Sequence, residues 1–240
     1  MITYVKDLTA RETEIIRIIR VLGSSPSKFV VVGGYAVNAL AAHRFSVDCD
    51  VVIVKKDVGL LESILREEGY NKVKTTRKIK GLYRAHFKEY GKLIGNRKVS
   101  VDLFVNSVTC RQTNGEWSYS LIRKNSIEAN VVGLTDSAVA FVPKRELLMA
   151  MKIHSGRGTD LRDVIMLSEG ADWQVVAKFA MCGVQKKSIK QLTDAIETIS
   201  KEEFPSALRA EFGLRTDVTP LIRRTTEGLD TVRKLLSASL

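Results

Sequence analysis

Three aspartates in this sequence stand in segments that are otherwise apolar. Asp48 and Asp50 are two residues apart in the valine-rich segment Ser46–Val54, and Asp102 lies in Val99–Val105. Residues i and i+2 of a strand face the same side, so both carboxylates of the first segment would point the same way. Two like charges so close repel each other and lose hydration unless a cation lies between them. Magnesium, which takes one or two carboxylates together with phosphate oxygens, is the natural occupant.

Each of these acidic signals also has a simpler structural interpretation. An edge strand whose polar face meets solvent or arginines would carry Asp48 and Asp50 equally well. Ser100 and Asp102 share a face, so the solvated side of an antiparallel sheet would explain Asp102. If the two strands instead pair side by side, three carboxylates converge on one site. Such a site can hold one or two metal ions and take the proton from an attacking hydroxyl.

Two glycines come shortly before the acidic segment. Phe29–Val32 is a short apolar run typical of a strand buried on both faces, and Gly33-Gly34 separate it from the alanine-rich helical segment Tyr35–His43. Glycine lets the backbone approach a ligand closely, and a helix N-terminus offers free N–H groups and a positive dipole to phosphate. A tight turn without a ligand is the simpler interpretation of this pair.

Together these residues resemble the signature of the DNA polymerase beta-like nucleotidyltransferase superfamily, and most of all its AbiEii-type and minimal members. The matching residues lie within 28–55 and 98–105: Gly33-Gly34, Arg44, Ser46, Asp48-x-Asp50 and Asp102. The resemblance implies transfer of a nucleoside monophosphate from a nucleoside triphosphate such as ATP to an acceptor hydroxyl. It also implies dependence on magnesium, or on manganese in its place.

The resemblance implies a role for each matched residue. Asp48, Asp50 and Asp102 would be the metal ligands and catalytic residues, with Asp102 activating the acceptor hydroxyl for in-line attack on the α-phosphate. The nucleotide-binding residues would be those that hold the triphosphate or neutralise its charge: Gly33, Gly34, Arg44, Ser46 and Lys152.

A looser match covers residues 143–167. A helix carrying Lys152, followed by Arg157 and the pair Asp160 and Asp163, is similar to the arrangement in AbiEii-like proteins. That similarity implies that these charges contact the phosphates or support the acidic strands. The alternative is that Asp160 caps the second of two helices, because the glycines on either side of Arg157 predict a break there.

The charge balance favours polyanionic partners. The chain of 240 residues has 38 Lys and Arg against 27 Asp and Glu, a net charge of +11. Residues 71–98 hold ten basic side chains and a single acid, Glu89, with aromatic side chains between them. This segment predicts an RNA surface, for a tRNA end for example, although a hairpin whose lysines protect its edges is the alternative. A protein partner modified on a hydroxyl, a toxin–antitoxin context and a non-catalytic RNA-binding or partner-binding module are the competing hypotheses.

The same sequence gives no sign of a membrane or of secretion. No apolar run approaches the length of a transmembrane helix, and the N-terminus lacks the pattern of a signal peptide. Three cysteines, Cys49, Cys110 and Cys182, lie far apart and are odd in number, which argues for a reducing compartment. We therefore expect a cytoplasmic protein with no membrane partner.

The order of elements predicts an α+β fold that is α/β-like in its N-terminal part. Strands and helices alternate up to residue 142, which predicts a nucleotidyltransferase-like catalytic core over 1–142 with a mixed or antiparallel sheet. Beyond that point the apolar residues follow a helical period, which predicts a helical domain over 143–240. The first helix is expected from Thr9, with Glu12 completing a capping box.

Overall fold

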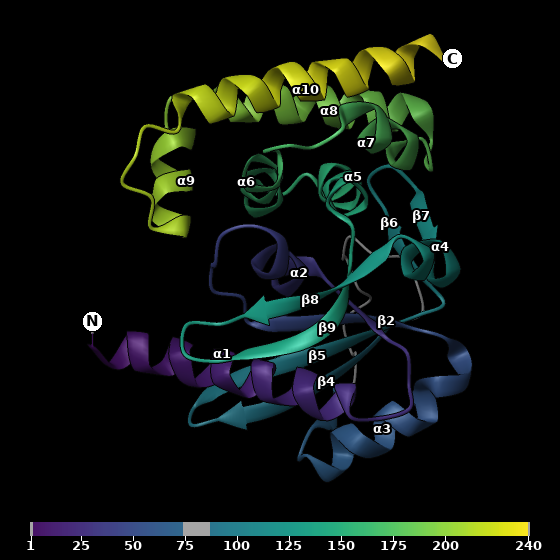
Figure 1. Cartoon of the computed structure of the whole chain (residues 1–240), viewed down its shortest axis with the longest axis vertical. Helices are drawn as coiled ribbons and strands as arrows, with labels where there is room; N and C mark the ends of the chain where they lie inside the picture. Colours follow the sequence, from purple (N-terminus) through teal and green to yellow (C-terminus); the bar gives the residue numbers. More distant parts are fainter. Residues whose placement is uncertain (1, 74–86, 240) are drawn as a thin grey trace. The chain divides into compact units, whose positions relative to one another are not determined.

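The computed structural model describes residues 2–73 and 87–239 (Figure 1). These residues form two compact units. The first holds residues 2–73, 87–108 and 118–143, and the second holds 109–117 and 144–239. The first unit combines helices with strands and the second is almost wholly helical, which confirms the predicted α+β class.

A five-stranded sheet is the centre of the first unit, in the order β1-β2-β5-β4-β3. Its strands are β1 (Val30–Val32), β2 (Asp48–Ile53), β3 (Asn71–Lys72), β4 (Phe87–Ile94) and β5 (Arg97–Val105). Strands β2 and β5 pair in parallel and every other pair is antiparallel, so the sheet is mixed. Strand β1 is buried throughout, as the continuous apolar run Phe29–Val32 predicts.

Helices and a hairpin complete the first unit. They are α1 (Ile2–Gly23), α2 (Gly33–Leu40), the 3₁₀ turn η1 (Lys55–Asp57), α3 (Val58–Glu67), α4 (Tyr119–Lys124), β8 (Ser126–Val132) and β9 (Ser137–Pro143). Helix α1 packs against β5, β4 and β9, and α2 packs against β8 and β2 (Figure 1). A row of isoleucines on α1, including Ile15 and Ile19, is fully buried and forms part of the core.

The start of the first helix differs from the prediction. Helix α1 begins at Ile2, so Thr9 lies inside it and makes no capping box with Glu12. No glycine or proline interrupts the chain before Gly23, and the helix therefore continues through the expected boundary. The buried Glu12 carboxylate instead accepts hydrogen bonds from His43 and from the backbone N–H of Leu134.

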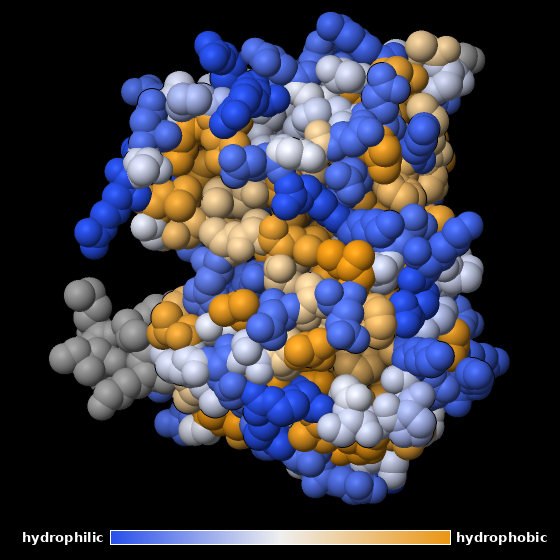
Figure 2. All heavy atoms as spheres, viewed as in Figure 1, coloured by the Kyte–Doolittle hydropathy of each residue, from blue (hydrophilic) through white to orange (hydrophobic). Residues whose placement is uncertain are grey.

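The second unit consists mainly of six helices that follow the β9 strand. They are α5 (Arg145–Ser155), α6 (Gly158–Leu167), α7 (Trp173–Ala180), α8 (Gln185–Ile199), α9 (Phe204–Phe212) and α10 (Thr219–Ala238). The short strands β6 (Ser107–Cys110) and β7 (Gly115–Ser118) precede them in the chain. Helix α10 packs along α8 and α7, and hydrophilic residues predominate on its visible surface (Figures 1 and 2). None of the helices in the described ranges combines the length and hydropathy that a membrane-spanning segment requires.

Candidate active site

The predicted acidic residues come together on two neighbouring strands. In the parallel pairing of β2 with β5, Asp48 is opposite Ser100 and Asp50 is opposite Asp102. Directly paired residues of parallel strands project to the same side, and so does a residue two positions along, so the three aspartates share one face of the sheet. The prediction that these strands lie side by side is confirmed.

The same topology removes both simpler interpretations of the aspartates. Strand β2 is no edge strand, because it lies between β1 and β5. Asp102 does not stand on an open solvated face, because its side chain is partly buried and its Oδ1 atom is buried without a hydrogen-bond partner among the described residues.

Asp102 is the most perturbed carboxyl of this group. Burial raises its pKa to about 8, and the charges of Asp50, Asp48 and Glu89 act in the same direction, while Lys98 opposes them. A carboxyl group with such a pKa exchanges its proton near neutral pH, which is where a general base works best. Desolvation and like charges together, with one oxygen unpartnered, mark Asp102 as a candidate catalytic residue.

Ser100 is a site residue that the sequence analysis did not assign. Its hydroxyl donates a hydrogen bond of 2.5 Å to Asp48 Oδ1, and it is almost fully buried. This contact fixes the carboxylate of Asp48, which is otherwise exposed at the start of β2. The signal was present in the sequence, since Ser100 stands two residues before Asp102 on the same face, but only the strand register shows what it contacts.

The two glycines bring the start of helix α2 against the acidic strand. Gly33 has a φ of +68°, in the left-handed region that favours glycine, and a Cβ atom at this position would collide with the Asp50 carboxylate. A Cβ on Gly34 would lie 2.7 Å from Ser46 Oγ. Both glycines therefore allow close approach, and they place the N-terminus of the helix beside the Asp50 carboxylate.

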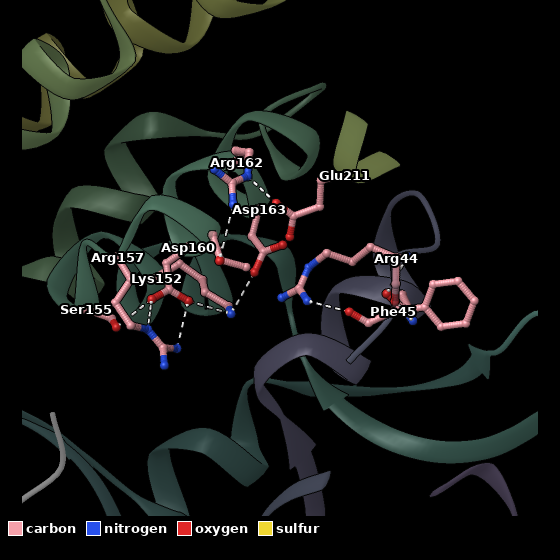
Figure 3. Close-up of polar contacts among 11 residues, drawn as sticks. Arg44, Phe45, Lys152, Ser155, Arg157, Asp160, Arg162, Asp163 and Glu211 are labelled. Carbon is pink, nitrogen blue, oxygen red and sulfur yellow. Dashed lines mark hydrogen bonds and ion pairs between the residues drawn. The ribbon is translucent and has the colours of Figure 1, made fainter. Parts of the chain in front are cut away.

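Arg44 and Ser46 are held around the same turn by side chains that precede them. Asn38 accepts from the backbone N–H of Arg44 at 3.1 Å and donates to its carbonyl at 2.9 Å. The buried Arg44 side chain donates to the Phe45 carbonyl at 3.2 Å (Figure 3) and lies beside Gly34. The Tyr35 hydroxyl donates a hydrogen bond to the Ser46 carbonyl. The predicted residues Gly33, Gly34, Arg44 and Ser46 are thus grouped next to the aspartates.

The aspartates suit a hard divalent cation. The buried oxygen of Asp102 without a hydrogen-bond partner, together with the like charges of Asp50 and Asp48, would be stabilised by a cation. No set of three or more histidine, cysteine or acidic side chains in the described residues is already arranged around a metal position. A cation here would need further oxygens from a substrate, and magnesium typically binds in that way, through one or two carboxylates and phosphate oxygens.

In the second unit, Lys152 is surrounded by carboxylates (Figure 3). Its ammonium nitrogen lies 2.8 Å from Asp160 Oδ1 and 2.8 Å from Asp163 Oδ2, and all three side chains are buried. Asp160 also accepts hydrogen bonds from Ser155 and Arg157, both at 2.6 Å. The interpretation of Lys152 as nucleotide-binding stays a prediction, and its charge is already shared between two buried carboxylates.

The predicted helix break is present, but the capping role of Asp160 is wrong. Helix α5 ends at Ser155, with Gly156 in the left-handed conformation, and α6 begins at Gly158. The N-cap of α6 is Arg157, which makes no side-chain cap, and Asp160 points instead to Lys152, Ser155 and Arg157. Burial alone would raise the pKa of Asp160, but the charges and hydrogen bonds of Lys152 and Arg157 outweigh it and hold that pKa well below its usual range.

The basic segment 71–98 is described only in part, since residues 74–86 lie outside the described ranges. In the remainder, three lysines form ion pairs within the unit: Lys88 with Glu62, Lys92 with Glu14 and Lys98 with Glu89. Strands β4 and β5 form the hairpin that the alternating pattern predicts. An RNA surface on this segment stays a prediction.

Known proteins resemble this chain in structure and not in sequence. No protein-family model matches the sequence, and no curated protein matches it. Similar solved structures include ANT(2")-Ia in complex with adenylyl-2"-tobramycin, at 12% identity and a TM-score of 0.46 over 70% of this chain and 95% of that one. Another is the lincomycin-bound lincosamide antibiotic adenylyltransferase LnuA, at 16% identity and a TM-score of 0.45 over 67% and 98%. A third is JHP933 from Helicobacter pylori, at 15% identity and a TM-score of 0.45 over 95% and 93%.

With TM-scores below 0.5, these likenesses leave the function of the chain to be argued from its own residues.

Proposed function

We propose that this protein is a magnesium-dependent nucleotidyltransferase that transfers a nucleoside monophosphate from a nucleoside triphosphate to an acceptor hydroxyl. One observation carries the proposal: Asp48, Asp50 and Asp102 share a sheet face on adjacent parallel strands, and Asp102 keeps a buried oxygen without a partner. Such an arrangement costs stability unless a cation completes it, and the start of helix α2 beside it suits the phosphates of a nucleotide.

The reaction requires the acceptor oxygen to bond to the α-phosphorus while the bond from that phosphorus to its bridging oxygen breaks and pyrophosphate leaves. Asp48 and Asp50 would hold the cation, with Ser100 fixing the orientation of Asp48. Asp102 would take the proton from the acceptor hydroxyl, because its carboxyl group lies opposite Asp50 on the adjacent strand. Magnesium, when bound, neutralises phosphate charge and the charge of the carboxylates.

The glycine turn and its neighbours would bind the triphosphate. Because Gly33 and Gly34 have no side chains, Asp50 and Ser46 lie against the first turn of α2, whose N-terminal N–H groups would bind the phosphate oxygens. Ser46 adds a hydroxyl next to Gly34, and Arg44 adds a positive charge that its buried side chain holds close to the turn. Charge-assisted hydrogen bonds of this kind are stronger than those between neutral groups.

The test is nucleotide binding by calorimetry with ATP, GTP, CTP and UTP, with and without magnesium. We expect one or more triphosphates to bind wild type only with magnesium, and Asp48→Asn to lose that binding. Glu67→Gln, which removes an exposed carboxylate on α3, is the matched control and should bind as wild type does. Magnesium-dependent binding that survives in both Asp48→Asn and Asp50→Asn would overturn the proposal.

For the acceptor, we propose RNA, with a tRNA end as the first to be screened, because of the excess of basic residues in segment 71–98. Labelled nucleotide appearing on RNA would support this choice, and label on a protein would favour the alternative of a modified side-chain hydroxyl. Two finer predictions, an AbiEii-type subclass and a toxin–antitoxin context, depend on the identity of the acceptor. Finding the labelled acceptor would test them. Salt-dependent RNA binding that Asp48→Asn leaves unchanged, with no triphosphate bound, would instead favour a non-catalytic RNA-binding module.

A further inference from the structure

A cavity of the first unit is separate from the carboxylates. Its volume is about 590 Å³, and its wall runs from the end of α1 through Lys28 and Phe29 to the β8–β9 hairpin. Lys28 and Phe29 precede strand β1, whereas Gly33 follows it, so the cavity and the glycine turn lie at opposite ends of that strand. The volume is within the range of small-molecule binding sites.

One wall of the cavity carries a flat cation on an aromatic ring. The guanidinium of Arg123 lies 3.6 Å from the centre of the Phe141 ring, which places it over the ring. Its Nε atom is buried and has no hydrogen-bond partner among the described residues. A guanidinium group stacked on an aromatic ring suits a planar ligand such as a nucleobase, which can extend the stack.

The charges of the lining favour an anion. Three basic residues, Arg20, Lys28 and Arg123, line the cavity with one acidic residue, Glu128. Arg20 is fixed by Asp136 and by the Ser137 carbonyl. Lys28 is exposed and forms no ion pair with any residue in the described part of the chain. A negatively charged phosphate group would pair with the exposed Lys28.

The hairpin adds polar and apolar groups that a nucleoside would need. Asn130 is paired with Val139 and Glu128 with Phe141 across the two strands, and all four line the cavity. An amide and a carboxylate can together accept from and donate to the edge of a base. Val139 is 58% exposed although it is apolar, so a ligand covering it would remove apolar surface from water.

We propose that this cavity binds a nucleoside monophosphate unit, with its base on Arg123 and the hairpin and its phosphate at Lys28. The unit is supplied either by a free nucleotide or by an unpaired nucleotide of single-stranded RNA, because both present a base and a negatively charged phosphate group. The site needs neither the carboxylates nor a metal ion, so it is independent of the proposed transferase activity.

The test uses the full chain carrying Asp48→Asn, in a chelator, so that the candidate active site contributes no metal-dependent binding. The probes are AMP, GMP, CMP and UMP in calorimetry and a short fluorescein-labelled single-stranded RNA in anisotropy. We expect binding that Lys28→Glu weakens about tenfold or more, because the phosphate then meets a negative charge. Lys124→Glu makes the same change of charge at an exposed position outside the lining and should leave the affinity unchanged.

Two further variants protect the test against misfolding. Asn130→Ala alters an exposed lining residue and should weaken binding without affecting the circular dichroism spectrum. Arg123→Gln removes the cation stacked on Phe141 and should weaken binding as well. Binding of free monophosphates would identify a nucleotide site, and Lys28-dependent binding of RNA alone would identify an RNA site; both support the proposal. The proposal is overturned if neither probe binds, or if Lys28→Glu and Asn130→Ala bind as tightly as Lys124→Glu.

Discussion

Asp102 in strand β5 and Asp160 in helix α6 are aspartates on largely apolar elements, and their surroundings differ. Asp160 accepts from Lys152, Ser155 and Arg157. Asp102 lies near two further aspartates, and one of its oxygens has no partner in the described residues. The pKa shifts follow this contrast, since that of Asp160 is lowered and that of Asp102 is raised to about 8.

The contrast extends to the two units. The buried side-chain atoms without a hydrogen-bond partner in the described residues belong to Arg11, Asp102 and Arg123, all of the first unit. Unsatisfied buried polar groups cost stability, and a bound ligand or ion is one way in which proteins satisfy them. The acidic cluster of the helical unit is therefore complete within the chain, whereas we propose that a bound cation completes the one in the sheet.

The largest effect is expected from removing the cation of the complete cluster. Lys152→Met leaves Asp160 and Asp163 buried without their shared ammonium, and breaking a buried ion pair from one side costs about 3–5 kcal/mol. Both tryptophans of the chain, Trp117 and Trp173, belong to the helical unit, so urea unfolding followed by their fluorescence measures this loss. A loss below about 1 kcal/mol, the size of an exposed pair, would contradict the contrast between the clusters.

His154 provides a pH-dependent test of the helical unit. Burial lowers its pKa to about 4 from an ordinary value of 6.5, while its ring contacts Thr113 and the Ala180 carbonyl. The unfolded chain then binds a proton that the folded chain does not, so stability is complete above pH 6.5 and falls as pH drops towards 4. The loss is on the order of 3 kcal/mol, at 1.36 kcal/mol per pKa unit.

The control for this titration is His154→Gln, followed by tryptophan fluorescence at several pH values between 7 and 4. The variant is expected to be less stable at neutral pH and to lose the part of the acid dependence that belongs to His154. An unchanged slope of stability against pH in the variant would show that other groups are responsible.

A smaller change in stability, of the opposite sign, is expected for the three aspartates of the sheet. Asp102→Asn removes a desolvated carboxylate beside two like charges, so we expect it to stabilise the first unit by about 1–2 kcal/mol in the presence of a chelator. Calorimetric unfolding measures the gain, with tryptophan fluorescence separating the helical unit. Magnesium with a bound triphosphate should stabilise wild type more than the variant. Destabilisation by Asp102→Asn would mean that its carboxylate is already satisfied inside the protein.

The smallest effect is expected from Ser100→Ala. Loss of a single hydrogen bond to Asp48 should cost about 1 kcal/mol of stability and weaken magnesium-dependent nucleotide binding by a few fold. Ser100→Thr keeps the hydroxyl and should restore the binding, which a purely structural loss would not predict. Equal affinities for all three proteins would show that Ser100 does not position the carboxylate.

The sequence was sufficient for the elements that carry strong local signals. The apolar run before Gly33 and the valines around Asp50 each lie in a strand, and the glycines beside Arg157 mark the break between α5 and α6. Where the local signal was weak, the prediction was wrong, as at Thr9, because nothing before Gly23 stops the helix. The capping role of Asp160 was also wrong, because a buried ammonium competes for its carboxylate more strongly than a backbone N–H does.

By itself, the sequence determined that Asp48 and Asp50 share a strand face and that two glycines precede a helix, because these follow from local periodicity and chain geometry. Only the tertiary structure decided that Asp102 is opposite Asp50, that Ser100 holds Asp48, and that Lys152 is enclosed by Asp160 and Asp163. Strand register and ion pairing join residues far apart in the chain, and the energy that selects them comes from burial and charge in the folded molecule.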